Sequence, residues 1–201
     1  MENKHQYRLA IFASGGGSNA RAIFEYFENH SSIKVVLVIS NKSQVGVHQV
    51  ASSYGVESVF LPKSQLSEQD VLLPLLHSRH IDFIVLAGYL LLIPDWLIAA
   101  FPDKIFNIHP SLLPKYGGKG MYGHHVHEAV KSNHEKESGM TIHLVNEKFD
   151  KGEILFQAKT KVQPEMTADD IAAAVLLLEH ENYAITIEKF ILGIQNGEIT
   201  N

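Results

Sequence analysis

The chain has 201 residues, is 45% hydrophobic and 19% charged, and carries a formal net charge of −5. This length and composition predict a soluble globular domain with a substantial core, and the negative charge argues against broad binding to nucleic acid or anionic membranes. The chain has no cysteine, which excludes disulfides, thiol nucleophiles and Cys-ligated metals. Residues 1–8 lack the apolar core of a signal peptide, and the apolar run over 83–93 is too short to cross a bilayer, so we expect a cytoplasmic protein.

Short apolar strands alternate with helices through the first half of the chain. Strands are predicted over 9–13, 33–39, 56–61, 83–87 and 104–108, and helices over 19–28, 45–54, 67–79 and 94–101. Pro94 suits the first turn of the last of these helices, whereas Pro74 makes the third less regular. The alternation predicts βαβ units and a mostly parallel sheet.

The pattern changes in the second half. Residues 140–145 and 153–162 alternate like strands, and the short connection between them predicts antiparallel pairing. A long helix is predicted over 167–195, with Thr167 and the pair Asp169-Asp170 at its capped start. We therefore expect a single α/β domain over 1–201, built on an open, mostly parallel sheet with an antiparallel edge and a long C-terminal helix. Ligands of such sheets bind outside the carboxyl ends of the strands.

The segment Asn107-Ile108-His109-Pro110-Ser111-Leu112-Leu113-Pro114 stands at such an end. Asn107 and His109 are two residues apart, so on a strand they point to the same face and can address one reacting atom. Asn donates hydrogen bonds without changing charge, while His gives or takes a proton near neutral pH. The pair suits a reaction that develops an oxyanion and moves a proton. Alternatively, both side chains satisfy backbone groups of the loop.

A glycine-rich loop, Ser14-Gly15-Gly16-Gly17-Ser18-Asn19, joins the first strand to the first helix. Glycines let the backbone approach an anion closely, and a helix N-terminus supplies free N–H groups. The loop is therefore a candidate phosphate site, with a tight turn that binds nothing as the alternative. It fits neither the Walker A pattern nor the dinucleotide fingerprint.

Asp150 stands in an ordinary turn sequence, in which Asp is followed by x-Gly. Brought beside His109 by the fold, however, its carboxylate would stabilise an imidazolium and relay a proton.

Four further polar residues have simple explanations. His124, His125 and His127 lack a defined set of metal ligands and are interpreted as surface or substrate-loop residues, so no metal is expected. Glu179 fits a solvated face of the long helix.

Together these features resemble the glycinamide ribonucleotide transformylase family over nearly the whole chain. The resemblance is carried by the segment 107–114, by Gly17-Ser18-Asn19, by Leu86-Ala87-Gly88-Tyr89 and by Asp150-Lys151-Gly152. It implies a Rossmann-like formyltransferase fold, and transfer of formyl from 10-formyltetrahydrofolate to the amine of glycinamide ribonucleotide in de novo purine synthesis. It also implies a nucleotide- and phosphate-binding half over 1–105 and a catalytic and folate-binding half over 106–201.

The resemblance also assigns roles to single residues. Asn107 and protonated His109 would stabilise the oxyanion, each such donor being worth about 3–4 kcal/mol. Asp150 would keep His109 charged and help to move the amine proton, and His143 would support the site. The binding residues implied are Gly17, Ser18 and Asn19 for the phosphate, Glu179 for the ribose, and Leu90, Leu91, Leu92, Val145, Asn146 and Asp150 for the folate.

Two departures from the family pattern stand out. The loop over 116–124 is longer and richer in glycine than usual, which indicates a mobile cover over the substrates. Leu91 replaces an Arg that many members have, which removes the contacts of that side chain with folate. Small-molecule substrates are the expected partners, without nucleic acid or membrane, in a monomer or homodimer.

Other functions share the catalytic segment. A 10-formyltetrahydrofolate hydrolase would carry an N-terminal regulatory domain, whereas the first strand here is predicted near Arg8, and a methionyl-tRNA formyltransferase would carry a C-terminal β-rich domain. A sugar N-formyltransferase is disfavoured by the candidate phosphate loop. A non-catalytic nucleotide-binding protein is disfavoured because it would not need Asn107, His109 and Asp150 together.

Overall fold

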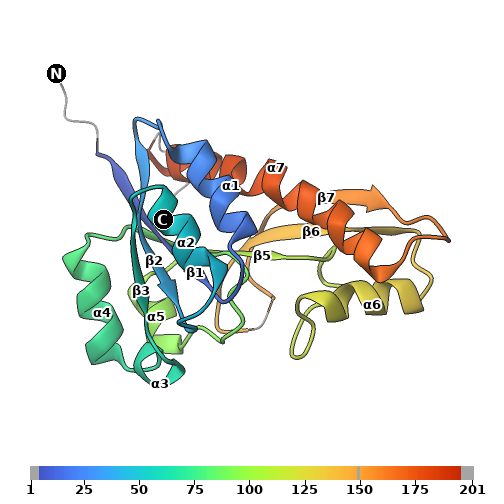
Figure 1. Ribbon diagram of the computed structural model, residues 1–201, viewed down its shortest axis with the longest axis horizontal. Helices are drawn as coiled ribbons and strands as arrows, with labels where there is room; N and C mark the ends of the chain where they lie inside the picture. Colours follow the sequence, from blue (N-terminus) through green and yellow to red (C-terminus); the bar gives the residue numbers. More distant parts are fainter. Residues whose placement is uncertain (1–4, 149, 196–201) are drawn as a thin grey trace. The chain divides into compact units, whose positions relative to one another are not determined.

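The computed structural model describes residues 5–148 and 150–195 (Figure 1). The strands are β1 Tyr7–Ala13, β2 Ile33–Ser40, β3 Glu57–Phe60, β4 Phe83–Leu86, β5 Ile105–His109, β6 Glu137–Leu144 and β7 Ile154–Lys161. The helices are α1 Ser18–Phe27, α2 Gly46–Ser53, α3 Lys63–Leu66, α4 Gln69–Ser78, α5 Asp95–Ala100, α6 His124–Ser132 and α7 Ala168–Gln195. The sheet order is β3-β2-β1-β4-β5-β6-β7, and by contacts the chain divides into two compact units after Phe106.

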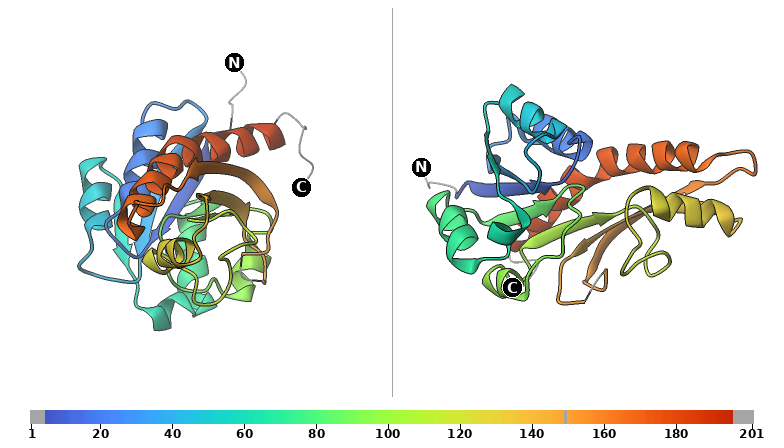
Figure 2. Two further views of the ribbon diagram at one scale, coloured as in Figure 1. Left: turned by 90° about the vertical axis from the view of Figure 1, so that its right-hand side faces the viewer. Right: turned by 60° about the horizontal axis from the view of Figure 1, so that its bottom comes forward.

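The first unit is a parallel sheet with helices on both faces. β1 pairs in parallel with β2 and with β4, and β2 pairs in parallel with β3. Residues Leu9–Ala13 are fully buried, which explains their unbroken apolar sequence. α1 and α2 contact each other and β2, while α4 and α5 lie on the opposite side of these strands (Figure 2). The expected parallel α/β arrangement is confirmed.

The helix expected over 67–79 was wrong at its start. A short helix, α3, precedes it, and Ser67 closes α3 because its N–H donates to the carbonyl of Lys63 at 3.2 Å. α4 then begins at Gln69 and keeps Pro74 in its interior. A proline there removes one backbone hydrogen bond without ending the helix.

The second unit combines the antiparallel pair β6 and β7 with two helices. The predicted pairing is confirmed, with Gly139 opposite Lys159. Gly139 is required, because a Cβ atom there would lie 2.1 Å from the carbonyl oxygen of Ala158. α7 contacts both strands and α6 (Figure 1).

α7 begins and packs as its sequence predicts. Thr167 N–H donates to Oδ2 of Asp170 at 2.8 Å, and Asp170 N–H returns a bond to Oγ1 of Thr167 at 3.1 Å, which is a reciprocal cap. The buried apolar residues of α7 at four-residue intervals are Ile171, Val175, Tyr183, Ile187 and Ile191. Over the described part of the chain, no helix has both the length and the apolar character needed to span a membrane.

Candidate active site

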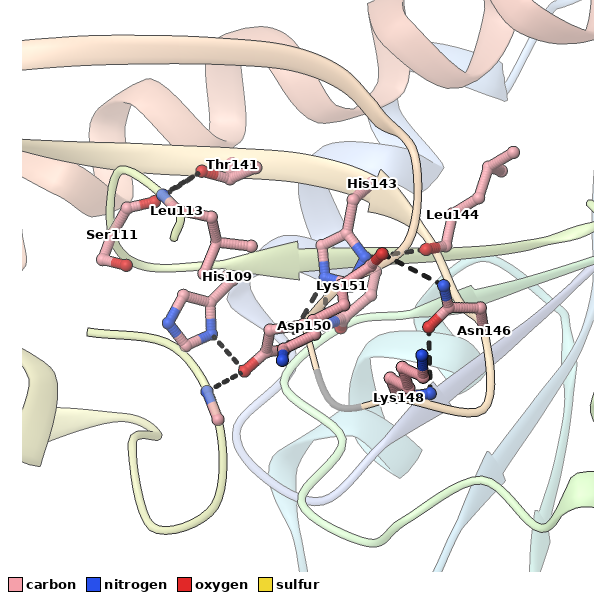
Figure 3. Close-up of polar contacts among 12 residues, drawn as sticks. His109, Ser111, Leu113, Thr141, His143, Leu144, Asn146, Lys148, Asp150 and Lys151 are labelled. Atoms are coloured by element: carbon pink, nitrogen blue, oxygen red, sulfur yellow. Dashed lines mark hydrogen bonds and ion pairs between the residues drawn. The ribbon is translucent and has the colours of Figure 1, made fainter. Parts of the chain in front are cut away.

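His109 and Asp150 lie together in the second unit, although they come from different elements. His109 is the last residue of β5 and is only 4% exposed. Its Nδ1 lies 3.7 Å from Oδ2 of Asp150, which belongs to the connection between β6 and β7 (Figure 3). The fold thus brings the carboxylate to the imidazole.

Two main-chain groups of the segment 116–123 contact this pair. The carbonyl oxygen of Tyr116 lies 2.7 Å from Nε2 of His109, and the N–H of Gly118 donates to Oδ2 of Asp150 at 2.7 Å. A carbonyl oxygen can only accept, so Nε2 of His109 carries a proton. A second proton, on Nδ1, would face the negative charge of Asp150.

His143 and Asn107 form the adjoining contact. Nδ1 of His143 donates to the carbonyl of Leu144 at 2.8 Å, so in the neutral ring Nε2 is an acceptor. That atom lies 3.1 Å from Nδ2 of Asn107, which donates to it, and 3.7 Å from Oδ1 of Asp150. Burial lowers the pKa of His143 below its usual value, against the opposing effects of the Leu144 carbonyl and Asp150. Neutral His143 therefore orients the amide of Asn107, whose second N–H can donate to a substrate oxygen.

The chain after His109 is tied to β6 and β7. Thr141 lies two residues from His143 on β6, and its hydroxyl donates to the carbonyl of Ser111 at 2.6 Å while accepting the N–H of Leu113 at 3.0 Å. Gln157 of β7 donates to the carbonyl of Leu113 at 3.0 Å and to Oγ1 of Thr141 at 2.8 Å. These bonds fix the exit of the catalytic segment.

The loop that carries Asp150 is held by its own side chains. Asn146 donates to the carbonyl of Lys151 at 3.0 Å and accepts the N–H of Lys148 at 3.0 Å (Figure 3). Asp150 has a φ of 51°, in the left-handed region that Asp tolerates better than most residues. A Cβ atom on Gly152 would lie 1.6 Å from the carbonyl oxygen of Leu144, so this position must be glycine. Phe149, within the predicted folate loop, lies outside the described residues.

In the first unit, Gly17, Ser18 and Asn19 form the start of α1. Gly17 has a φ of 82°, and a Cβ atom there would lie 2.9 Å from Cα of Val47. Among the residues that the structure describes, no side chain caps α1, and the first turn of this helix contains no acidic residue. The backbone N–H groups of this turn can therefore receive an anion.

The structure corrects two expectations about polar side chains. His127 lies on α6, 5% exposed, rather than at the surface, and its Nδ1 has no hydrogen-bond partner in the described residues. His124 and His125 of the same helix are exposed as expected, but on a helix rather than a loop. Glu179 is 7% exposed and occupies the buried stripe of α7, so its solvated-face interpretation was wrong.

The other predicted binding residues are more accessible. Leu90 is 51% exposed and Leu92 is 60% exposed, and the N–H of Leu90 donates to the hydroxyl of Ser14 at 3.0 Å. Leu91 and Val145 are half-buried. Within the described residues, no group of three or more His, Asp or Glu side chains is placed to hold a metal ion.

Sequence reasoning missed several contributors to the site. Tyr116 and Gly118 act through main-chain atoms, which leave no signature in residue type. Thr141 could have been found, because it shares a strand face with His143 by the two-residue period. The resemblance already assigns Glu179 to the ribose, and its burial could have been recognised as well, because it stands four residues from both Val175 and Tyr183.

A parallel α/β sheet and a cluster of two buried histidines with a partly buried Asp and Asn at one strand end are typical of enzymes that transfer a group with the help of a proton donor. The family model described as formyl transferase matches residues 7–187. The chain therefore belongs to the formyl transferase family.

Several similar proteins are named for the same kind of activity. A phosphoribosylglycinamide formyltransferase of Haemophilus influenzae is 34% identical over 191 residues, covering 92% of this chain and 88% of that protein. A chloroplastic protein of the same name from Arabidopsis thaliana is 44% identical over 182 residues, covering 88% of this chain. The chain spans only 62% of the length of that plant protein. The crystal structure of phosphoribosylglycinamide formyltransferase from Brucella melitensis matches with a TM-score of 0.83 and 35% identity, covering 92% of this chain and 95% of that one.

Proposed function

We propose that this protein transfers the formyl group of 10-formyltetrahydrofolate to the amine of glycinamide ribonucleotide, giving formylglycinamide ribonucleotide and tetrahydrofolate. The observation that carries the proposal is the pair of buried His109 and partly buried Asp150 beside the hydrogen-bonded pair of Asn107 and His143. Relatives and solved structures named for this activity support it.

The chemistry follows from the groups in this cluster. The amine nitrogen attacks the formyl carbon, and the carbonyl oxygen becomes an oxyanion that accepts hydrogen bonds from the amide of Asn107 and from the Nδ1–H of protonated His109, whose Nε2–H is bound to the carbonyl of Tyr116. Asp150 takes part in moving the proton that the attacking amine loses. The bond from carbon to N10 then breaks, and N10 of the folate gains a proton as tetrahydrofolate leaves. No bond to the enzyme forms in this sequence.

The binding roles belong to the same proposal. Gly17, Ser18 and Asn19 hold the phosphate, which the uncapped start of α1 supports. Glu179 binds the ribose hydroxyls. The folate contacts Leu90, Leu91 and Leu92 together with Val145, Asn146 and Asp150, and because the Asn146 side chain is engaged within its loop, that residue offers main-chain groups.

An acceptor screen tests the proposed function. Purified protein is given 10-formyltetrahydrofolate with glycinamide ribonucleotide, with an amino-sugar nucleotide, or with water alone, and release of tetrahydrofolate is measured. We expect release that saturates with glycinamide ribonucleotide. Equal release in water would indicate a hydrolase, preference for the amino sugar would indicate a sugar formyltransferase, and binding without turnover would indicate a non-catalytic protein.

A further inference from the structure

The carboxylate of Glu135 holds Tyr116, the first residue of the segment 116–123, and Lys115 just before it. The ammonium group of Lys115 donates to both of its oxygens, at 2.9 and 3.3 Å. The hydroxyl of Tyr116 donates to Oε1 at 3.0 Å. The main chain is held as well, because Oγ of Ser111 donates to the carbonyl of Lys115 at 2.6 Å.

Charge and burial agree with these roles of donor and acceptor. The hydrogen bonds from Lys115 and Tyr116 lower the pKa of Glu135, which is therefore an anionic acceptor. Burial, followed by the bond to Glu135, raises the pKa of the Tyr116 hydroxyl, which is therefore a neutral donor.

Tyr116 also has a strained backbone. Its φ is 55°, in the left-handed region that costs energy for a residue with a Cβ atom. Such a conformation persists where surrounding contacts enforce it. The side chain of Tyr116 is bound to Glu135, while its carbonyl is bound to Nε2 of His109.

The turn beyond Tyr116 has little space in which to adjust. A Cβ atom on Gly117 would lie 2.5 Å from Cδ2 of Leu113, and the next N–H, that of Gly118, is bound to Asp150. A change in the direction of the Tyr116 carbonyl would therefore disturb the contacts of both His109 and Asp150.

We propose that Glu135 and Tyr116 are positioning residues for formyl transfer: they hold the Tyr116 carbonyl against Nε2 of His109 and thereby keep Nδ1 directed at Asp150. The kinetic part of this inference rests on the proposed function. Neither residue needs to touch a substrate. A half-turn of the imidazole would put Cε1 in the place of Nε2 and Cδ2 in the place of Nδ1, so that neither nitrogen would face its present partner. The bond from Nε2 to a fixed carbonyl opposes that rotation.

Kinetics of four variants test the inference. Glu135→Ala and Tyr116→Phe should each lower kcat about tenfold and leave the KM of both substrates within about twofold. Glu135→Gln keeps an oxygen acceptor for the Tyr116 hydroxyl and should retain most of the activity. Glu137→Ala is the matched control, because Glu137 accepts a comparable bond from Lys159 at 3.0 Å and is the first residue of β6, six residues before His143.

Nuclear magnetic resonance supplies a readout that does not depend on turnover. In protein labelled with 15N-histidine, the His109 signals are assigned by their loss in His109→Gln. We expect the neutral ring to show a proton fixed on Nε2 in the native protein and in Glu137→Ala. Glu135→Ala and Tyr116→Phe should show the two ring nitrogens averaging between tautomers.

The inference would be overturned if kcat stayed within about twofold of the native value in both Glu135→Ala and Tyr116→Phe, or if the tautomer pattern were unaltered in both. An equal loss in Glu137→Ala would also overturn it, since that loss would reflect general destabilisation. If the native protein transferred no formyl to glycinamide ribonucleotide, the proposed function would fail, and the tautomer pattern would still decide the positioning role.

Discussion

Nδ2 of Asn107 lies 3.1 Å from Nε2 of His143, whose other ring nitrogen is already bound to the carbonyl of Leu144. Replacing His143 by Ala would release the amide of Asn107 to rotate. We expect kcat to fall about tenfold, with less effect on the KM of either substrate, because the amide is aimed at the oxyanion and not at the bound ground state. Steady-state kinetics would measure this, and a change confined to KM would contradict the orienting role.

The three groups proposed for catalysis should each be costly to remove. Asn107→Ala, His109→Ala and Asp150→Ala are each expected to lower turnover by at least about a hundredfold, because each removes a donor or charge that stabilises the transition state. Circular dichroism and thermal unfolding would establish that the variants fold. Near-normal rates in all three folded variants would rule out the mechanism.

Binding of the ribonucleotide phosphate is tested at the start of α1. Asn19→Ala is expected to raise the KM for glycinamide ribonucleotide about tenfold and to leave kcat near its native value, because the phosphate is remote from the reacting amine. Ser53→Ala serves as the control, since it removes a hydrogen bond within α2 from the hydroxyl to the carbonyl of Val50. The assignment fails if the two variants have the same KM.

Stability should depend on pH through His127. Burial, then the nearby His124 and His109, lower its pKa from the usual 6.5. As pH falls below 6.5, the unfolded chain takes up a proton at this position before the folded protein does, so stability is lost on acidification, by at most about 1.4 kcal/mol per pH unit from one such group.

His127→Leu should remove this contribution, whereas His125→Leu changes an exposed histidine of the same helix. Urea unfolding between about pH 7.5 and 5 would show a shallower loss of stability for His127→Leu than for the native protein. An identical pH dependence in both variants would exclude His127 as its source.

The local pattern of the sequence was sufficient to predict most of the fold, and it also predicted the shared orientation of Asn107 and His109 within the catalytic cluster. The shared face of Asn107 and His109 follows from the two-residue period of a strand, and the cap of α7 follows from Thr167 and Asp170. The approach of Asp150 to His109 could be expected only through the family resemblance, because it depends on how β5 and the connection between β6 and β7 pack in three dimensions.

In each error, the local sequence suggested an environment that the packing of the helix does not provide. α6 was not predicted because the glycines that precede it resemble a loop, so the burial of His127 was not foreseen either. Glu179 was assigned to a solvated face because a carboxylate is seldom buried. However, the buried residues of α7 recur every four positions and Glu179 stands at one of these positions, which indicates a buried side chain. The packing of α7 does bury it.

The segment 116–123 reaches His109 and Asp150 through the carbonyl of Tyr116 and the N–H of Gly118, both main-chain atoms. Every amino acid supplies a carbonyl, and every one except proline supplies an N–H. The exposed side chains that follow, Lys119 and Tyr122, are therefore open to exchange for fluorescent or cross-linking groups that would report on substrate arrival without rebuilding the catalytic centre.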